Sequence, residues 1–458
     1  MFPLSLGEIA GIIGAGLKGS EGKTIIPFVS TDSRKIKEGE LFFALRGDNF
    51  DGHKFVAAAA AAGAAGAVVE EEPPVIPEDF PLLLMRDSLA GLQDLARHNR
   101  KLAGIPIIGI TGSTGKTSTK DLIFAVLASA YKTLKTEGNY NNEIGLPLTL
   151  LQLNGEYRAA VVEMAMRGLG EIDFLCRMAL PSAGVVTNIG ETHLERLGSV
   201  ENIARAKGEL LEHIPSDGFA VLHGNSPLIR EQAARCRCRV LFFGEGEDMD
   251  LYPREIRPED GGNRFVAVTP KGEIELFVPL PGRHNVINSL AAVAVGLEMG
   301  VSPAGIARGL HSAALSSMRL EILDAGGIKI INDTYNANPY STRAALQVLG
   351  EVAGGGRKVA VLADMLELGA RATAAHREVG EAVAEEGIDY LVTVGNLSKF
   401  IHQGAQNAGL SKERAAHFSS GDDALKMLKD LLEPGDVVLV KGSRSMHMEE
   451  IVKGLSAE

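Results

Sequence analysis

Short apolar runs separated by turn-forming residues occupy the first part of the chain. An alanine-rich stretch at 57–65 lies among four of them, which read TIIPFVSTDSR (24–34), GELFFAL (39–45), AGAVVEE (65–71) and PLLLMRD (81–87). Runs of this length bounded by Gly, Pro, Ser and Asp predict β-strands, and the alanine-rich stretch predicts a helix. The proline-rich segment 71–81 predicts a connecting loop. Residues 1–84 are therefore expected to form a small α/β domain.

Helix and strand patterns alternate from about residue 85 to residue 313. Leu89, Leu92, Leu95 and Ala96 recur at the spacing of one helix face, and a second helix is predicted at 116–130. Three runs are apolar without alternation, namely IPIIGI (105–110), YRAAVVEMA (157–165) and SAGVVTNIG (182–190). Strands of this kind with helices between them indicate a parallel sheet covered on both faces.

The last part of the chain repeats this alternation. Four apolar runs end where polar residues begin, namely GIKIINDTY (327–335), RKVAVLADM (357–365), YLVTVGN (390–396) and DVVLVKGS (436–443). The pattern predicts a doubly wound, Rossmann-like domain with ligand groups at the carboxyl ends of its strands. The predicted fold class is therefore α/β in three domains: a small N-terminal domain (1–84), a central P-loop ATPase-type domain (85–313) and this C-terminal domain (314–458).

The charge balance and the cysteines narrow the class of protein. The 458 residues carry a formal net charge of -12, with 45% hydrophobic and 23% charged residues. This balance is typical of a soluble globular protein and argues against a nucleic-acid partner. Cys176, Cys236 and Cys238 fit neither a disulfide framework nor a zinc site. A redox pair of Cys236 and Cys238 is the alternative, and ordinary thiols of a reducing cytoplasm are expected. The N-terminus predicts no signal peptide, and we expect no membrane span.

A glycine-rich turn joins the predicted strand at 105–110 to the predicted helix at 116–130. Backbone N–H groups of such a turn and the positive end of the helix bind phosphate oxygens. Lys116 would reach the β- and γ-phosphates, and the Thr117 hydroxyl would bind Mg²⁺. Ile110 stands where the strict motif has glycine, so the loop is a variant, and a turn without a ligand is the alternative. The predicted nucleotide loop comprises Thr111, Gly112, Ser113, Thr114, Gly115, Lys116, Thr117 and Ser118.

The variant loop and the segments that follow it resemble one family. In chain order these segments are NNEIGLP (141–147), TNIGETHLERLGS (187–199), IARAKGELL (203–211), GRHNVINSLAAVAVG (282–296), MRLE (318–321), NDTYNANPYSTRAAL (332–346), ADMLELG (363–369) and VKGSRSMHME (440–449). Together they are similar to the Mur ligases, which build the peptide of bacterial peptidoglycan. NDTYNANPYS and ADMLELG favour the branch that adds D-alanyl-D-alanine to UDP-N-acetylmuramoyl-tripeptide.

The resemblance implies an ATP-driven amide ligase. In this family the γ-phosphoryl group of ATP passes to a peptide carboxylate, and the amine of the second substrate then displaces phosphate from the acyl phosphate. A carboxylate that meets a triphosphate needs fixed positive charge, which Lys116 and two Mg²⁺ ions would supply. The implied catalytic residues are Lys116, Glu163, His193 and Lys207, and the implied metal ligands are Thr117, Glu163, His193 and Lys207.

Lys207 lies on the apolar stripe of a predicted helix, four residues after Ile203 and three before Leu210. On the residues alone, a lysine whose ammonium reaches solvent is the simplest explanation. Similarly, Glu163 could be an ordinary strand-end carboxylate and His193 a surface histidine. In Mur ligases the matching lysine commonly carries a carbamate that holds Mg²⁺, and burial favours the neutral amine that carbamylation requires. We therefore expect carbamylated Lys207 at the second metal.

Further substrate contacts are implied in all three domains. Adenine contacts are expected from Asn285 and Asn288, which are three residues apart on a predicted helix. Arg319 would face the phosphates, a role compatible with the alternative of a hinge salt bridge, and Asp333 would face the ribose. The D-alanyl-D-alanine pocket is expected among Tyr335, Asn336, Ser341, Asp364, Lys441, Ser443 and Arg444. The muramoyl peptide is expected near Asn141, Asn142 and Arg167, and the uridine nucleotide near Ser30, Thr31, Asp32, Ser33, Arg34, Asn49 and His53.

Three other functions compete with this one. Another Mur ligase or a folylpolyglutamate synthetase would share the loop and differ in the amine accepted. A nucleotide switch would hydrolyse nucleotide without a peptide acceptor, and the guanine-binding Asn-Lys-x-Asp motif is absent from the sequence. A binding protein without catalysis would have no need of Lys116, Glu163, His193 and Lys207. We expect a monomer whose three domains close around the ligands.

Overall fold

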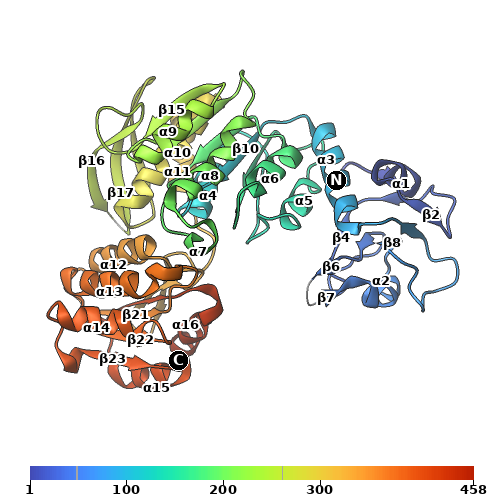
Figure 1. The fold of residues 1–458 in the computed structure, drawn as a ribbon. Coiled ribbons are helices and arrows are strands. Elements are labelled where there is room, and N and C mark those ends of the chain that lie inside the picture. The colour runs from blue at the N-terminus through green and yellow to red at the C-terminus, as the bar shows by residue number, and fades with distance from the viewer. Residues whose placement is uncertain (48–49, 260, 458) are drawn as a thin grey trace.

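The computed structural model describes residues 1–47, 50–259 and 261–457. Three α/β parts follow one another along the chain, and the central part lies between the other two (Figure 1). Each part has its own, mostly parallel sheet, which confirms the predicted fold class. Within the described residues, no helix has both the length and the apolar character that crossing a membrane requires.

The N-terminal part is built on a five-stranded sheet with the order β2-β9-β8-β5-β4. All neighbours are parallel except β2, which is an antiparallel edge strand. The alanine-rich stretch is a helix followed by a buried strand, as predicted. The elements are β1 (Leu4–Ser5), α1 (Leu6–Ile13), β2 (Gly16–Lys18), β3 (Ile25–Ile26), β4 (Val29–Ser30), β5 (Leu41–Phe43), β6 (Arg46–Gly47), β7 (Phe50–Asp51), η1 (Gly52–Phe55), α2 (Val56–Ala61), β8 (Gly66–Val69) and β9 (Leu82–Leu84).

Helix α3 (Ser88–Ala103) joins the N-terminal part to the central part. Its first turn is capped by Asp87, whose carboxylate accepts the Ala90 N–H at 2.9 Å, and Gly104 ends it in the left-handed conformation. The helix packs against α1 on one side and against α5 (Gly145–Leu150) and α6 (Glu171–Ala179) on the other. One hydrophobic core consequently runs from the N-terminal part into the central part.

The central part contains a six-stranded, fully parallel sheet with the order β11-β12-β10-β13-β14-β15. The chain leaves β10 toward β11 and β12 on one side and reaches β13 to β15 on the other. The carboxyl end of β10 is thus the point where an open α/β sheet binds ligands. The strands are β10 (Ile107–Thr111), β11 (Thr133–Lys135), β12 (Ala159–Glu163), β13 (Ala183–Val186), β14 (Phe219–His223) and β15 (Arg239–Phe243), and the helices are α4 (Lys116–Ala128), α7 (Leu194–Leu197), α8 (Val200–Glu212), α9 (Pro227–Gln232), η2 (Ala233–Arg235), α10 (Arg283–Glu298) and α11 (Pro303–His311).

A three-stranded antiparallel sheet, which the sequence analysis missed, extends the central part. It consists of β16 (Tyr252–Glu259), β17 (Gly262–Thr269) and β18 (Gly272–Val278). Along β17 and β18 the buried residues Phe265, Ala267, Ile274 and Leu276 are separated by more exposed ones. This two-residue period is typical of a sheet with one face on a core, here the core that contains α10 and α11.

The C-terminal part has a six-stranded sheet with the order β19-β20-β24-β21-β22-β23. Only the edge strand β19 is antiparallel to its neighbour. The four predicted apolar runs correspond to β20, β21, β22 and β24, whereas β19 and β23 were not predicted. The elements are β19 (Glu321–Ala325), β20 (Ile328–Asp333), α12 (Pro339–Ala353), β21 (Lys358–Ala363), η3 (Gly369–Arg371), α13 (Ala372–Glu385), β22 (Tyr390–Val394), α14 (Lys399–Asn407), η4 (Lys412–Arg414), β23 (Ala415–Phe418), α15 (Gly421–Leu431), β24 (Val437–Lys441), η5 (Arg444–Met446) and α16 (Glu449–Ser456).

Candidate active site

The glycine-rich turn lies where the central sheet binds ligands, between the end of β10 and the start of α4. Gly115 has φ +76°, and a Cβ added there would lie 3.2 Å from Oδ1 of Asn288. At Gly112 a Cβ would lie 2.0 Å from Oγ1 of Thr187, which no side chain could tolerate. Only glycine fits these two positions, and both close approaches bring the loop backbone against neighbouring side chains. The first-turn N–H groups of α4 are left available for an anion.

Two lysines converge on one carbonyl oxygen of this loop. Nζ of Lys116 donates to the Gly112 oxygen at 2.7 Å, and Nζ of Lys207 donates to the same oxygen at 2.9 Å. Burial holds the pKa of Lys116 below its usual value, an effect that Glu163 opposes. Burial, together with the charge on Lys116, holds the pKa of Lys207 well below its usual value. The Lys207 side chain is 2% exposed, so it does not reach solvent as the simplest explanation of the sequence would require.

Glu163 ends β12 beside the loop and is 2% exposed. Its Oε2 accepts the Thr117 hydroxyl at 2.7 Å, and its Oε1 accepts Nδ2 of Asn141 at 2.8 Å. The backbone N–H of Glu163 donates to Oγ1 of Thr136 at 3.0 Å, which fixes the end of the strand. A hydroxyl and a carboxylate held this close are hard oxygen donors of the kind that Mg²⁺ prefers.

His193 lies just before α7 and is tied to the C-terminal part. Its Nδ1 lies 2.6 Å from Oε2 of Glu367, and its backbone adopts φ +58°. The hydrogen bond from His193 lowers the pKa of Glu367. Arg371 approaches Glu191 at 3.4 Å in the same contact region. The histidine therefore presents Nε2 as its remaining nitrogen, while a carboxylate of another part of the chain orients the ring.

A cavity of about 790 Å³ lies between the central and C-terminal parts. Its walls include most of the predicted ATP, metal and dipeptide residues and one predicted muramoyl-peptide residue, Asn141. These are Ser113, Thr114, Gly115, Lys116, Thr117, Ser118, Asn141, Glu163, His193, Asn288, Arg319, Asp333, Tyr335, Asn336, Ser341 and Lys441. Lys207 is not among the lining residues and reaches the loop from behind. In the described residues, no three His, Cys, Asp or Glu side chains are grouped closely enough to form a metal cage by themselves.

The C-terminal wall of the cavity is organised by two charged contacts. The guanidinium of Arg319 lies 4.1 Å from the centre of the Tyr335 ring, and burial raises the pKa of that tyrosine. Lys441 pairs with Asp333 and donates to the carbonyl oxygen of Asn336 at 2.9 Å. Because Lys441 is 2% exposed and anchors two predicted substrate residues, it orders this wall.

Several lining residues were not predicted individually. They are His223, Asn225, Glu245, Arg283, His284, Asn338, Tyr340 and Arg343. His284 belongs to the recognised segment 282–296, so its position beside Asn285 was a usable signal. Burial lowers the pKa of His284 to about 4, although the charge on Asp333 acts against this.

Asn285 and Asn288 do not share the cavity, although both belong to α10. Asn288 lines it, whereas Asn285 is 1% exposed and donates Nδ2 to the Pro281 oxygen at 2.7 Å. The Asn285 Oδ1 has no hydrogen-bond partner in the part of the chain that the structure describes. The hydroxyl of Thr111 is likewise buried there without a partner. Neither Asn285 nor Thr111 lines the cavity, so the structure does not show the direct contacts predicted for these two residues.

Three predicted dipeptide residues have structural partners instead of facing the cavity. Asp364 accepts the N–H groups of Asn396, Leu397 and Ser398 at 3.0, 2.9 and 2.7 Å. The Ser443 hydroxyl accepts the Leu366 N–H at 2.9 Å, and Arg444 pairs with Glu449 at 3.1 Å. A carboxylate that caps a loop through three amides has little capacity left for a ligand. The prediction of a pocket among the strand ends thus narrows to Tyr335, Asn336, Ser341 and Lys441.

Two predicted muramoyl-peptide residues lie near the cavity without lining it. The Asn142 Oδ1 accepts the Gly145 N–H at 2.9 Å and so orders the start of α5. Arg167 lies 3.7 Å from Glu143, and its guanidinium is half exposed. Asn141 alone of these three lines the cavity.

The predicted uridine segment follows β4 in the N-terminal part. Ser30, Thr31 and Ser33 are half-buried there, and Asp32 pairs with Arg34 at 2.8 Å. This hydrogen bond from Arg34 lowers the pKa of Asp32 to about 2. His53 is buried, and both of its ring nitrogens have partners. Its Nε2 accepts the Glu70 N–H at 2.8 Å, and its Nδ1 contacts Asp51. It therefore has a packing role, and Asn49 lies outside the described residues.

Comparisons with known protein families cover all three parts. Residues 25–100 match the model described as "Mur ligase family, catalytic domain". Residues 110–296 match the "Mur ligase middle domain", and residues 318–444 match the "Mur ligase, glutamate ligase domain".

Curated relatives match over nearly their whole length. A protein of Bacillus subtilis is 42% identical over 94% of both chains, and one of Escherichia coli is 37% identical over 99% of both chains. Each is named UDP-N-acetylmuramoyl-tripeptide–D-alanyl-D-alanine ligase.

Solved structures agree with these relatives. A crystal structure of MurF from Acinetobacter baumannii has 34% identity and a TM-score of 0.89, with 100% of this chain and 99% of that chain covered. MurF of Thermotoga maritima in complex with ADP has 28% identity and a TM-score of 0.81, with 94% and 97% covered. A folylpolyglutamate synthase of Mycobacterium tuberculosis shares the fold at 17% identity and a TM-score of 0.64, with 80% and 93% covered.

Proposed function

The chain belongs to the Mur ligase family, and we propose that it uses ATP to join D-alanyl-D-alanine to UDP-N-acetylmuramoyl-tripeptide, yielding UDP-N-acetylmuramoyl-pentapeptide for peptidoglycan. The observation that carries this function is the full-length similarity to two ligases of that name. The cavity between the central and C-terminal parts supports it, because cationic groups and strand-end polar groups meet there.

In the proposed reaction the tripeptide carboxylate attacks the γ-phosphorus of ATP, the bond to the β-phosphate oxygen breaks, and ADP leaves. The amine of D-alanyl-D-alanine then attacks the carbonyl carbon of the acyl phosphate. A C–N bond forms and the amine loses a proton. The bond between the carbonyl carbon and the phosphate oxygen breaks, and inorganic phosphate leaves. Lys116 would hold the phosphoryl oxygens through both steps, since its side chain lies at the glycine-rich loop and lines the cavity.

Mg²⁺ fits the residues at the loop. The Thr117 hydroxyl and the Glu163 carboxylate are adjacent hard donors, and Asn141 orients the carboxylate. Bound there, Mg²⁺ would neutralise phosphate oxygens and so reduce their repulsion of the incoming carboxylate. We assign a second ion to His193 and carbamylated Lys207. Burial supports the modification of Lys207, because it lowers the pKa of the amine, and carbamate formation needs the neutral amine.

On the C-terminal wall we assign the dipeptide to Tyr335, Asn336, Ser341 and Lys441, and the nucleotide to Asn288, Arg319 and Asp333. All seven line the same cavity, so the attacking amine and the phosphoryl group would lie in one space. The uridine end is assigned to the segment 30–34 of the N-terminal part. We also propose that the protein acts as a monomer in the cytoplasm, where ATP is available.

The competing functions differ in what they consume. The folylpolyglutamate synthase has only the fold in common at 17% identity, and a switch would need no acceptor amine. The decisive measurement is phosphate release with UDP-muramoyl-tripeptide, with and without D-alanyl-D-alanine, and mass spectrometry of the product. Turnover that requires both substrates and yields the pentapeptide is expected. Equal ATP hydrolysis without either peptide substrate would contradict the proposal.

A further inference from the structure

The linker between the central and C-terminal parts is hydrogen-bonded to the helix that carries the phosphate loop. It runs from the end of α11 at His311 to the start of β19 at Glu321. Midway, the backbone N–H and the hydroxyl of Ser316 both donate to Oδ2 of Asp121, at 2.9 and 2.8 Å. Asp121 lies on α4, five residues after Lys116. The linker is thus hydrogen-bonded to α4, the same helix that begins at Lys116 of the phosphate loop.

Asp121 is a fixed point because it is buried and fully paired. The side chain is 1% exposed, its Oδ1 accepts Nζ of Lys135 at 2.8 Å, and Nζ of Lys120 lies 3.4 Å away. Lys120 also donates to the Thr136 oxygen at 2.8 Å, and the hydroxyl of Thr136 accepts the N–H of Glu163. A buried carboxylate with this many partners cannot shift without leaving charges unpaired. The same network reaches the end of β12 beside the loop.

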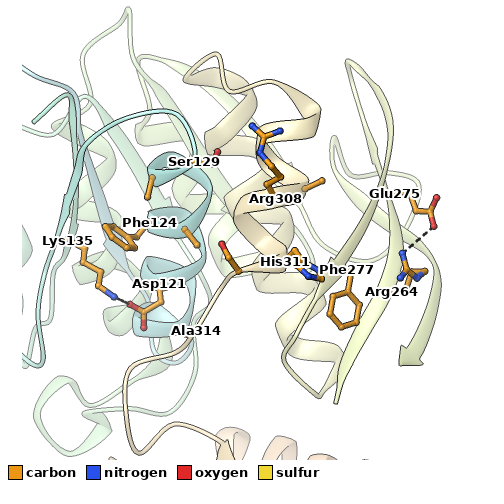
Figure 2. A pocket seen from close by; sticks show the side chains of 14 residues that line it. Asp121, Phe124, Ser129, Lys135, Arg264, Glu275, Phe277, Arg308, His311 and Ala314 are labelled. Carbon is orange, nitrogen blue, oxygen red and sulfur yellow. Dashed lines mark hydrogen bonds and ion pairs between the residues drawn. The ribbon is translucent and has the colours of Figure 1, made fainter. Parts of the chain in front are cut away.

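The linker is packed at some points and open at others, since Ala313 belongs to the hydrophobic core of the central part and Leu315 packs against that core. A second cavity, of about 900 Å³, lies between α4, α11 and the β17–β18 hairpin, and Ser312 and Ala314 form part of its wall (Figure 2). Figure 2 shows Asp121 joined to Lys135 on one wall and the linker descending from Ala314 toward the C-terminal part. The two hydrogen bonds to Asp121 therefore add directional contacts at Ser316 to the packing of Ala313 and Leu315 just before it.

The other end of the linker enters the catalytic cavity. Arg319 lies three residues after Ser316, its guanidinium stacks on Tyr335 at 4.1 Å, and both line the cavity. Without the hydrogen bonds between Ser316 and Asp121 the linker could rotate. The Arg319 side chain would then no longer enter the cavity at a fixed position.

We propose that Asp121 and Ser316 are positioning residues for the ligation: they pin the pivot of the C-terminal part to the phosphate-loop helix, so that Arg319 meets the nucleotide in one register. This role rests on the proposed function. Neither residue lines the cavity between the central and C-terminal parts, so both would act through the linker and Arg319.

Ser316→Ala tests the role, and Ser317→Ala is its matched control. Ser317 is the next residue of the same linker and is exposed. Ser316→Ala should lower kcat/KM for ATP about 10-fold, as expected for loss of a hydrogen bond to a charged acceptor, with binding of UDP-muramoyl-tripeptide unchanged. Ser317→Ala should match the wild type.

Amide hydrogen exchange in the ligand-free protein gives a readout separate from turnover. Peptides covering 313–320 should exchange faster in Ser316→Ala than in Ser317→Ala, while peptides of the β16–β18 sheet stay unchanged. Asp121→Asn, if it folds, should show a larger effect of the same kind. Identical exchange and kinetics in the two serine variants would overturn the proposal. A wild-type protein that makes no pentapeptide would instead count against the proposed function, and the exchange comparison would still decide the pivot.

Discussion

Replacing Lys207 by alanine removes a buried amine at the glycine-rich loop. Its contact with the loop and the resemblance to Mur ligases both support a role for this lysine in the proposed reaction. Its Nζ and that of Lys116 donate to the same Gly112 oxygen, at 2.9 and 2.7 Å. We expect Lys207→Ala to fold and to lose nearly all ligation activity. The variant tests whether the residue acts as a carbamate, because an unmodified ammonium and a carbamate predict opposite electrostatics at the loop.

The magnitude follows from the shared acceptor. Two donors to one oxygen place the Nζ atoms within about 6 Å of each other, where two unit charges at an effective dielectric constant of about 20 interact with about 3 kcal/mol. Two ammonium groups would repel by that amount, whereas a carbamate would attract Lys116 by a similar amount. Loss of a carbamate worth about 3 kcal/mol at the transition state corresponds to a rate decrease of about 100-fold, before any loss of metal is added.

The assay combines turnover with chemical rescue. Short carboxylic acids should restore part of the activity of Lys207→Ala, because a free carboxylate can occupy the vacated position. They should not rescue Lys116→Ala, which lacks a cation at the same carbonyl and serves as the matched control. Wild-type protein equilibrated with ¹³C-bicarbonate should show a carbamate resonance that Lys207→Ala lacks. Wild-type turnover in Lys207→Ala without added acid, or no carbamate resonance in active enzyme, would refute the reasoning.

Three further predictions concern the metal, pH and shape. Glu163→Gln keeps the shape but loses the charge opposite Thr117, so the Mg²⁺ concentration for half-maximal turnover should rise about 10- to 100-fold; an unchanged Mg²⁺ titration would exclude Glu163 as a ligand. The pKa of His284 is about 4 in the fold against 6.5 in the unfolded chain. The unfolded chain therefore binds more protons between these values, and stability should fall as pH drops through that window. Because His284 is only half-buried, we discount the effect to roughly 1–2 kcal/mol, and urea unfolding of His284→Gln at pH 7 and 4.5 should lack this loss. ATP and UDP-muramoyl-tripeptide together should reduce the radius of gyration in small-angle scattering, and an unchanged curve would argue against domain closure.

Features set by local sequence were predicted well. The strand–turn–helix around the phosphate loop needs glycine at positions of close approach, so its residues identify it without the rest of the fold. The helical stripe around Lys207 correctly indicated a buried side, and the structure places this lysine inside. Strand-end polar residues such as Glu163 and Asp333 reach the cavity because parallel strands end at one edge.

Features set by the meeting of distant segments were missed. The contact of His193 with Glu367 depends on how two parts of the chain face each other, which no local pattern encodes. Asn285 and Asn288 are separated by about 60° around the helix, enough for one to be buried and the other to line the cavity. The β16–β18 sheet was not predicted, because its buried residues alternate with more exposed ones and form no continuous apolar run.

The cavity between the central and C-terminal parts has one wall on each of two sheets, and neither sheet forms it alone. A rigid small molecule that binds both walls at once would fix their spacing and would not need to imitate ATP or the dipeptide. Its affinity would include the free energy of bringing the two walls together, so tight binding would develop slowly. A substitution that alters the spacing between the sheets would weaken the binding. Such compounds could be selected by their effect on interdomain motion in place of competition with any one substrate.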